Sequence, residues 1–213
     1  VNGQLKKDIY GRWEGHLFTG LVGVPIVTQW LTKAGEAQVM YDMLKQRSFP
    51  GYLYMIENGA TTTWEHWNAR RSRIHNCYNG IGSWFYQALA GIVPDEDAPA
   101  YRHFFIRPQM ADGINFVRAL KPTPYGDIKV EWNLSKATFD VRLTIPPGTT
   151  ATLECPASLK AKVAEMPPSG LMRYGLIYNE NQRDRIDAPE NEKFPATDPI
   201  QLQSGTYRII YRL

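Results

Sequence analysis

The chain has 213 residues, enough for one large domain or two small ones, and its 43% hydrophobic and 21% charged residues are typical of a folded protein. No apolar run approaches the roughly 20 residues that a membrane-spanning helix needs, so no membrane partner is expected. The net charge of +3 is spread along the chain, and the largest basic cluster is Arg70, Arg71 and Arg73. Such a small cluster favours no nucleic-acid partner.

Apolar residues recur at helical spacing over about the first 95 positions. This spacing predicts helices over residues 25–33, 37–44 and 81–92. Residues 49–78 are rich in Trp, Asn, Gly and Thr, and predict a long irregular loop. Long structured loops between helices are where functional sites tend to lie.

The apolar spacing changes to two after about residue 98. Strands are predicted over residues 128–132, 139–145, 151–155 and 205–211, with turn residues between them. They favour an antiparallel sandwich whose core includes Trp132, Phe139, Val141 and Leu143. Residues 157–199 are rich in Pro, Asn and charge, and predict a long excursion between strands. The expected organisation is a helical domain over residues 1–97 and a sandwich domain over residues 98–213.

The segment 55–68 carries the densest set of chemically useful side chains. Glu57 and Glu65 lie eight residues apart, and Glu65 is flanked by Trp64 and by His66 and Trp67. A glycosidase needs a carboxylate near a surface on which a sugar can stack, either to accept a proton from water or to give one to the leaving oxygen. The spacing alone favours a structural interpretation, in which the Trp residues belong to the core and Glu65 caps a backbone segment or pairs with an arginine such as Arg70.

The remaining reactive side chains do not fall into patterns of known chemistry. His66 and His75 lack the ligand spacing of a zinc site, and no glycine-rich phosphate loop or serine nucleophile motif occurs. We therefore expect no metal and no cofactor. Cys77 and Cys155 lie far apart in the chain and are expected to be free thiols, which leaves the cellular compartment open.

Several ordered segments resemble the α-L-rhamnosidases of glycoside hydrolase family 78. Residues 58–67, NGATTTWEHW, are similar to that family's NGATTxWExW segment, and His75 with residues 81–86 resembles its H…VGxWFY stretch. Upstream, GHLFTG at 15–20 resembles its GHLxTG. Further resemblance to the family's C-terminal domain lies in segments 106–108, 125–126, 145–149 and 204–207.

The resemblance implies part of an (α/α)6 barrel followed by an antiparallel β-sandwich, and inverting hydrolysis of terminal α-L-rhamnose from glycosides or polysaccharides. It assigns Glu65 as the general base and His75 as a residue that contacts the rhamnose ring. Trp64, Trp67, His66 and Glu57 are the further substrate-binding candidates. The sequence departs from the family at Asn79, where glycine is usual, and at Ser83, where an acidic residue is usual.

The family's general acid lies in an acidic segment upstream of everything present here. About 95 residues supply only four or five of twelve barrel helices, at roughly 11 residues per helix. The sequence, which also lacks an initiator Met and a signal-peptide pattern, is therefore expected to be the C-terminal part of a longer enzyme. We expect it to be inactive without its N-terminal half. The parent would be periplasmic or secreted if it carries a signal peptide, and cytoplasmic otherwise.

Two other functional classes remain open at this point. One is a non-catalytic carbohydrate-binding or structural module, and the other is a related (α/α)6 enzyme acting on a different sugar. A polysaccharide lyase would require a Tyr/His pair and an arginine or metal to neutralise a uronate, and the Trp64–Glu65 loop favours hydrolysis instead.

Overall fold

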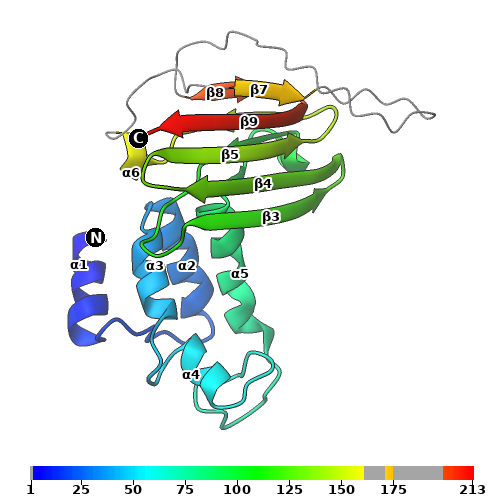
Figure 1. Cartoon of the computed structure of the whole chain (residues 1–213). Helices are drawn as coiled ribbons and strands as arrows, with labels where there is room; N and C mark the ends of the chain where they lie inside the picture. Colours follow the sequence, from blue (N-terminus) through cyan, green and yellow to red (C-terminus); the bar gives the residue numbers. More distant parts are fainter. Residues whose placement is uncertain (1, 161–170, 175–198) are drawn as a thin grey trace. The chain divides into compact units, whose positions relative to one another are not determined.

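The computed structural model describes residues 2–160, 171–174 and 199–213 (Figure 1). The chain divides into two compact units, Val1–Ala88 and Leu89–Leu213. The first unit is helical and the second is built from strands, as the change of apolar spacing predicted. Each unit is described below by itself.

The first unit contains short helices of three kinds. Its α-helices are α1 (Asn2–Lys7), α2 (Gly23–Lys33), α3 (Ala37–Leu44), α4 (Tyr52–Glu57) and α5 (Gly82–Trp84). Its other helical segments are η1 (Asp8–Arg12, π), η2 (Asn76–Ile81, 3-10) and η3 (Phe85–Leu89, π). The helices predicted over residues 25–33 and 37–44 are confirmed by α2 and α3.

The packing of this unit follows from the apolar faces of α2 and α3. Val24 and Leu31 of α2 and Met40 of α3 are completely buried. Two polar contacts join the first helical segments to the neighbourhood of α3: Lys6 Nζ lies 2.7 Å from Glu36, and the Tyr10 hydroxyl donates to Asp42 at 2.8 Å.

Two predictions for this unit were wrong in part. The stretch 49–78 is not wholly irregular, because α4 forms within it. The helix predicted over 81–92 ends at Leu89, and Ile92 instead begins strand β1 (Ile92–Pro94). Periodicity could not distinguish these outcomes, since Ile92 is buried by a strand partner, Ile106, that lies 14 residues further along the chain.

The second unit consists of two sheets. The first has four strands in the order β1, β2 (His103–Ile106), β6 (Thr150–Leu153) and β8 (Ile200–Leu202). The second has five strands in the order β3 (Phe116–Thr123), β4 (Gly126–Leu134), β5 (Thr138–Ile145), β9 (Gly205–Arg212) and β7 (Leu171–Tyr174). Neighbouring strands are antiparallel apart from β2 and β6, which are parallel. Two short helical segments, η4 (Pro99–Tyr101) and α6 (Ala157–Lys160), complete the unit.

The two sheets share one hydrophobic core. Trp132, Phe139, Val141 and Leu143 are all buried in it, as the alternation predicted. The indole N–H of Trp132 donates to the carbonyl of Leu89 at 2.8 Å, so the largest side chain of this core is buried with its polar atom satisfied. The predicted sandwich is confirmed.

The compact units separate after Ala88 rather than at residue 97. The reason is the close approach of the chain at Gly91, whose carbonyl accepts a hydrogen bond from the Arg107 N–H at 2.8 Å. Gly91 has a φ of 74°, and a Cβ at this position would lie 2.4 Å from backbone atoms of Arg107 and Pro108. Together with the pairing of β1 and β2, this contact makes the segment that follows Ala88 part of the sandwich unit.

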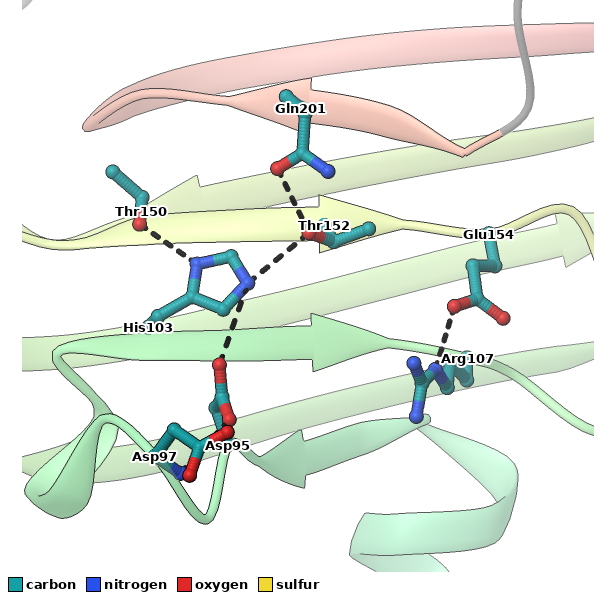
Figure 2. Close-up of polar contacts among 8 residues, drawn as sticks. All are labelled: Asp95, Asp97, His103, Arg107, Thr150, Thr152, Glu154 and Gln201. Carbon is teal, nitrogen blue, oxygen red and sulfur yellow. Dashed lines mark hydrogen bonds and ion pairs between the residues drawn. The ribbon is translucent and has the colours of Figure 1, made fainter.

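A row of polar side chains covers the four-stranded sheet on the side away from its core (Figure 2). His103 Nδ1 lies 2.7 Å from Thr150 Oγ1, and its Nε2 lies 3.1 Å from Thr152 Oγ1. Because the Thr152 hydroxyl donates to Gln201, it accepts from His103, so His103 carries a proton on Nε2. These side chains connect β2, β6 and β8 across the sheet.

Three further sequence predictions can be compared with the structure. Cys77 and Cys155 are both free thiols, as expected. The predicted excursion over 157–199 includes α6 and β7, and the rest of it lies outside the described residues. Within the described part of the chain, no helix combines the length and apolar character needed to cross a bilayer.

Candidate active site

The segment that carries Glu65 forms a narrow hairpin-like loop in the helical unit. The His75 N–H donates to the Thr63 carbonyl at 2.9 Å, and the Glu65 N–H donates to the Ser72 carbonyl at 2.8 Å. The chain reverses between these contacts, where Ala69 donates to the His66 carbonyl with a φ of 60°. Residues 63–65 and 72–75 are therefore held side by side, and Glu65 and His75 lie on the two arms of one loop.

The Glu65 carboxylate is half-buried and held at one oxygen. Its side chain is 22% exposed, and Oε2 accepts a hydrogen bond from the Ser72 backbone N–H at 3.2 Å. Oε1 lies 4.0 Å from His66 Nε2. Among the described residues, no arginine lies within ion-pair distance of Glu65, so the structural interpretation's pairing with Arg70 is not found, whereas its alternative of a backbone contact is present in the bond from Ser72. A carboxylate held in this way has one oxygen fixed by the backbone and one available for proton transfer.

Trp64 and Trp67 anchor the base of this loop. They are only 4% and 8% exposed. The Trp67 indole N–H donates to the Thr19 carbonyl at 3.1 Å, and its ring centroid lies 4.2 Å from that of Tyr78 and 5.3 Å from that of Tyr52. The packing that the structural interpretation expected is thus present for both Trp residues. Their expected contact with a sugar remains a prediction.

The tyrosines around Trp67 are held in an apolar setting. The Tyr52 hydroxyl donates to the Tyr78 carbonyl at 2.5 Å, and burial raises the pKa of Tyr52 well above its usual value. Burial likewise raises the pKa of Tyr78. Both phenols stay neutral over the working pH range of ordinary enzymes and form part of the support for the loop.

One of the two ring nitrogens of His75, Nδ1, is bound by the backbone. His75 caps the N-terminus of η2, where its Nδ1 accepts the Cys77 N–H at 3.4 Å. A ring nitrogen that accepts a hydrogen bond carries no proton, so the neutral imidazole bears its proton on Nε2. His75 is therefore oriented to offer an N–H donor, which suits a hydroxyl oxygen of a sugar.

Glu57 and His66, the two other polar residues predicted for the site, lie on different elements. Glu57 is the last residue of α4 rather than part of the loop, and its Oε1 pairs with Arg47 Nη1 at 3.3 Å on the surface. His66 is half-exposed next to Glu65. The structure brings Glu65, His66 and His75 into one loop and leaves Glu57 on the preceding helix.

Two supports of the site were not predicted from the sequence. His16 is buried and bonded through Nε2 to Ser48 Oγ at 2.7 Å and through Nδ1 to the Trp13 carbonyl at 3.0 Å. Thr19, three residues further along the chain, supplies its carbonyl to Trp67. The other support is the Ser72 peptide, which has no side-chain signature that could have revealed its contact with Glu65. The sequence did offer a signal for His16 and Thr19, because both lie in the GHLFTG segment that resembles a family motif.

No group of three or more metal-binding side chains occurs among the described residues. The loop carries two imidazoles, those of His66 and His75, and one carboxylate, that of Glu65, which are groups able to exchange protons and form hydrogen bonds.

Comparison with known proteins identifies the family to which this chain belongs. Residues 1–89 match the family model described as the bacterial alpha-L-rhamnosidase 6 hairpin glycosidase domain, so the helical unit is part of a glycosidase domain. Residues 91–167 match the bacterial alpha-L-rhamnosidase C-terminal domain. The chain belongs to the bacterial α-L-rhamnosidase family and corresponds to the C-terminal part of its members. This confirms the resemblance and the fold that it implied.

Individual relatives show the same correspondence. The chain is 35% identical over 153 residues to an α-L-rhamnosidase of Alteromonas sp. (strain LOR), covering 67% of this chain and 16% of the relative. It is 32% identical over 197 residues to one from Formosa agariphila, covering 86% of this chain and 21% of the relative. The solved Streptomyces avermitilis α-L-rhamnosidase complexed with L-rhamnose is similar with a TM-score of 0.73 and 26% identity, over 95% of this chain and 19% of that one. The chain thus spans about a fifth of the length of its relatives.

Proposed function

We propose that the protein carrying this chain releases terminal α-L-rhamnose from rhamnose-containing glycosides or polysaccharides with inversion of configuration, and that Glu65 is its general base. The observation that carries the proposal is the Glu65 carboxylate itself, half-buried in the loop and fixed at Oε2 by the Ser72 N–H. Family membership supports the substrate class, since the relatives are named α-L-rhamnosidases.

In the proposed reaction, Glu65 takes a proton from the attacking water. The Ser72 N–H occupies one carboxylate oxygen, so the geometry favours Oε1 as the acceptor. His75 donates from Nε2 to a hydroxyl oxygen of the rhamnose, and His66 lies beside the base. Inversion requires space for the water between base and sugar, so the Glu65 carboxyl would lie roughly 6.5–9.5 Å from the general acid.

We place the general acid outside this chain, in the N-terminal half of the enzyme. Apolar side chains on the helical unit are consistent with a covering partner of this kind: Val22 and Ile26 are 75% and 61% exposed, and Phe18 is also exposed. Soluble proteins rarely expose large contiguous apolar patches without a binding role. The proposal assigns these residues to contacts with the missing half of the barrel.

The test is a comparison of two carboxamide variants in the full-length protein. Glu65→Gln should keep the fold but lower kcat on an aryl α-L-rhamnoside by about 10²–10⁴-fold, because an amide cannot accept a proton from water. Glu57→Gln is the matched control and should retain most activity, since Glu57 pairs with Arg47 at the end of α4. The anomer first released, followed by NMR, should show inversion.

Three results would contradict the proposal. Loss of turnover in Glu57→Gln with retention in Glu65→Gln would make Glu57 the base. Release of rhamnose with retention of configuration would remove the general-base role. Absence of any glycosidase activity in the full-length protein would favour a carbohydrate-binding or structural module.

A further inference from the structure

One threonine of the loop is bonded to His75 from two directions. The Thr63 carbonyl accepts the His75 N–H at 2.9 Å, and the Thr63 hydroxyl donates to the His75 carbonyl. Both backbone polar groups of His75 are therefore bound by Thr63. Glu65 lies two residues further along the same segment, so the position of His75 relative to Glu65 depends on Thr63.

The same hydroxyl reaches a second residue. Thr63 Oγ1 also donates to Asn79 Oδ1 at 3.0 Å, so its single hydrogen is shared between this oxygen and the His75 carbonyl. Asn79 belongs to η2, the helical turn that His75 caps. Thr63 thus contacts the start of η2 through His75 and its later part through Asn79. This second contact depends on the Asn79 side chain and is lost when that side chain is removed.

The preceding threonine provides a comparison within the same loop. The Thr62 hydroxyl donates to the Arg73 carbonyl, which is the same type of contact on a neighbouring part of the return segment. Arg73 is exposed, and the Thr62 hydroxyl forms no hydrogen bond with His75 among the described residues. Two adjacent hydroxyls therefore secure the same segment, but only that of Thr63 holds His75.

We propose that Thr63 is a positioning residue for His75, and that Asn79 anchors the Thr63 hydroxyl in this chain. The inference rests on the proposed function, because it concerns how tightly the site holds its sugar. Within the described part of the chain, the Thr63 hydroxyl forms no hydrogen bond with the Glu65 carboxylate or the His75 imidazole. It acts by fixing the backbone from which the His75 ring extends.

The experiment compares KM and kcat in the full-length protein on one aryl α-L-rhamnoside. Thr63→Val removes the hydroxyl at nearly constant volume and should raise KM about five- to tenfold, the effect of one lost hydrogen bond, with a smaller change in kcat. Thr63→Ser keeps the hydroxyl and should restore KM to within about twofold of the wild-type value. His75→Ala provides the reference for complete loss of the contact and should raise KM more than it lowers kcat.

Two further variants separate positioning from general support of the loop. Thr62→Val is the matched control and should change KM less than about twofold, although it removes an equivalent hydroxyl contact. Asn79→Gly should raise KM by less than Thr63→Val, and its effect should disappear when it is combined with Thr63→Val.

The outcomes distinguish this inference from the proposed function. If the wild-type protein releases no rhamnose, the proposed function fails. If it is active but Thr63→Val behaves like Thr62→Val, or Thr63→Ser fails to restore KM, the positioning role is overturned. Should Thr63→Val not fold, Asn79→Gly decides: a wild-type KM in this variant overturns the inference, and a raised KM supports it.

Discussion

A single backbone N–H decides which nitrogen of His75 can meet a ligand. The residue type was evident from the sequence, but the orientation of the ring follows from the Cys77 N–H that binds its Nδ1. Similarly, Glu65 was recognisable by its neighbours, whereas the Ser72 peptide that holds its carboxylate was not. Contacts made by a main chain that folds back leave no signal in the local composition. For this reason the sequence offered candidate residues for the site but not the backbone contacts that hold them.

At the same scale, Tyr10 and Asp42 form a hydrogen-bonded pair, and the pKa of each side chain is shifted from its usual value. Burial, and then the hydrogen bond to Asp42, raise the pKa of Tyr10 to about 12 from its usual 10.0. For Asp42, burial acts to raise the pKa, but hydrogen bonds from Tyr10, Lys45 and Gln38 outweigh it and lower the pKa below its usual 3.8. Folding thus favours the neutral phenol of Tyr10 and the charged carboxylate of Asp42.

We expect the Tyr10 contribution to stability to be complete below pH 10 and to be lost as the pH rises through about 12. The Asp42 contribution should be complete above pH 3.8 and be lost as the pH falls through its lowered pKa. The measurement is the free energy of unfolding against pH for the wild type and Tyr10→Phe. The alkaline loss should be smaller in Tyr10→Phe, and an identical alkaline slope in the two proteins would contradict the assignment.

At the scale of elements, strands with alternating burial were the most predictable part of the molecule. β5 alternates buried residues with partly or fully exposed ones along its whole length, and its inward Phe139, Val141 and Leu143 were identified correctly. The end of the helix expected over 81–92 was misplaced because Ile92 has a residue of the distant strand β2 as its partner. The hairpin-like loop was not predicted either, since side-chain hydroxyls of Thr62 and Thr63 bind part of its backbone in place of a regular ladder.

The connection between β1 and the preceding helix allows a direct test. Gly91→Ala should destabilise the sandwich unit by at least about 2 kcal/mol, because the new Cβ would meet the backbone of Arg107 and Pro108 at a positive φ. Gly148→Ala is the matched control: Gly148 also has a φ of 74° but has no atom within 4 Å of the added Cβ. The control should cost only about 1 kcal/mol.

Hydrogen exchange of the amides in β2 and β6 reports the free energy of opening of this unit in both variants. Equal losses of protection for Gly91→Ala and Gly148→Ala would show that positive φ alone, rather than the close approach, requires glycine at position 91.

At the scale of the whole molecule, the chain spans about a fifth of the length of its relatives, and our proposal assigns activity to a longer polypeptide that contains it. We expect the isolated 213-residue chain to release no rhamnose from an aryl α-L-rhamnoside, because a general acid contributes about 10²–10⁴-fold and lies elsewhere in our proposal. Adding the preceding part of the polypeptide should restore turnover, and the same addition to a chain bearing Glu65→Gln should not. Turnover by the isolated chain at a rate typical of enzymes would place the general acid within it.

The parallel pairing of β2 and β6 has a consequence for the order in which the sandwich folds. β3, β4 and β5 follow one another along the chain and pair as neighbours, so their contacts close only short loops. β2 meets β6 across about forty residues that include this entire meander, and the entropy lost on closing such a loop must be offset before the pair gains any hydrogen bonds. The meander is therefore expected to form early, with the four-stranded sheet assembling on it in a later and slower step.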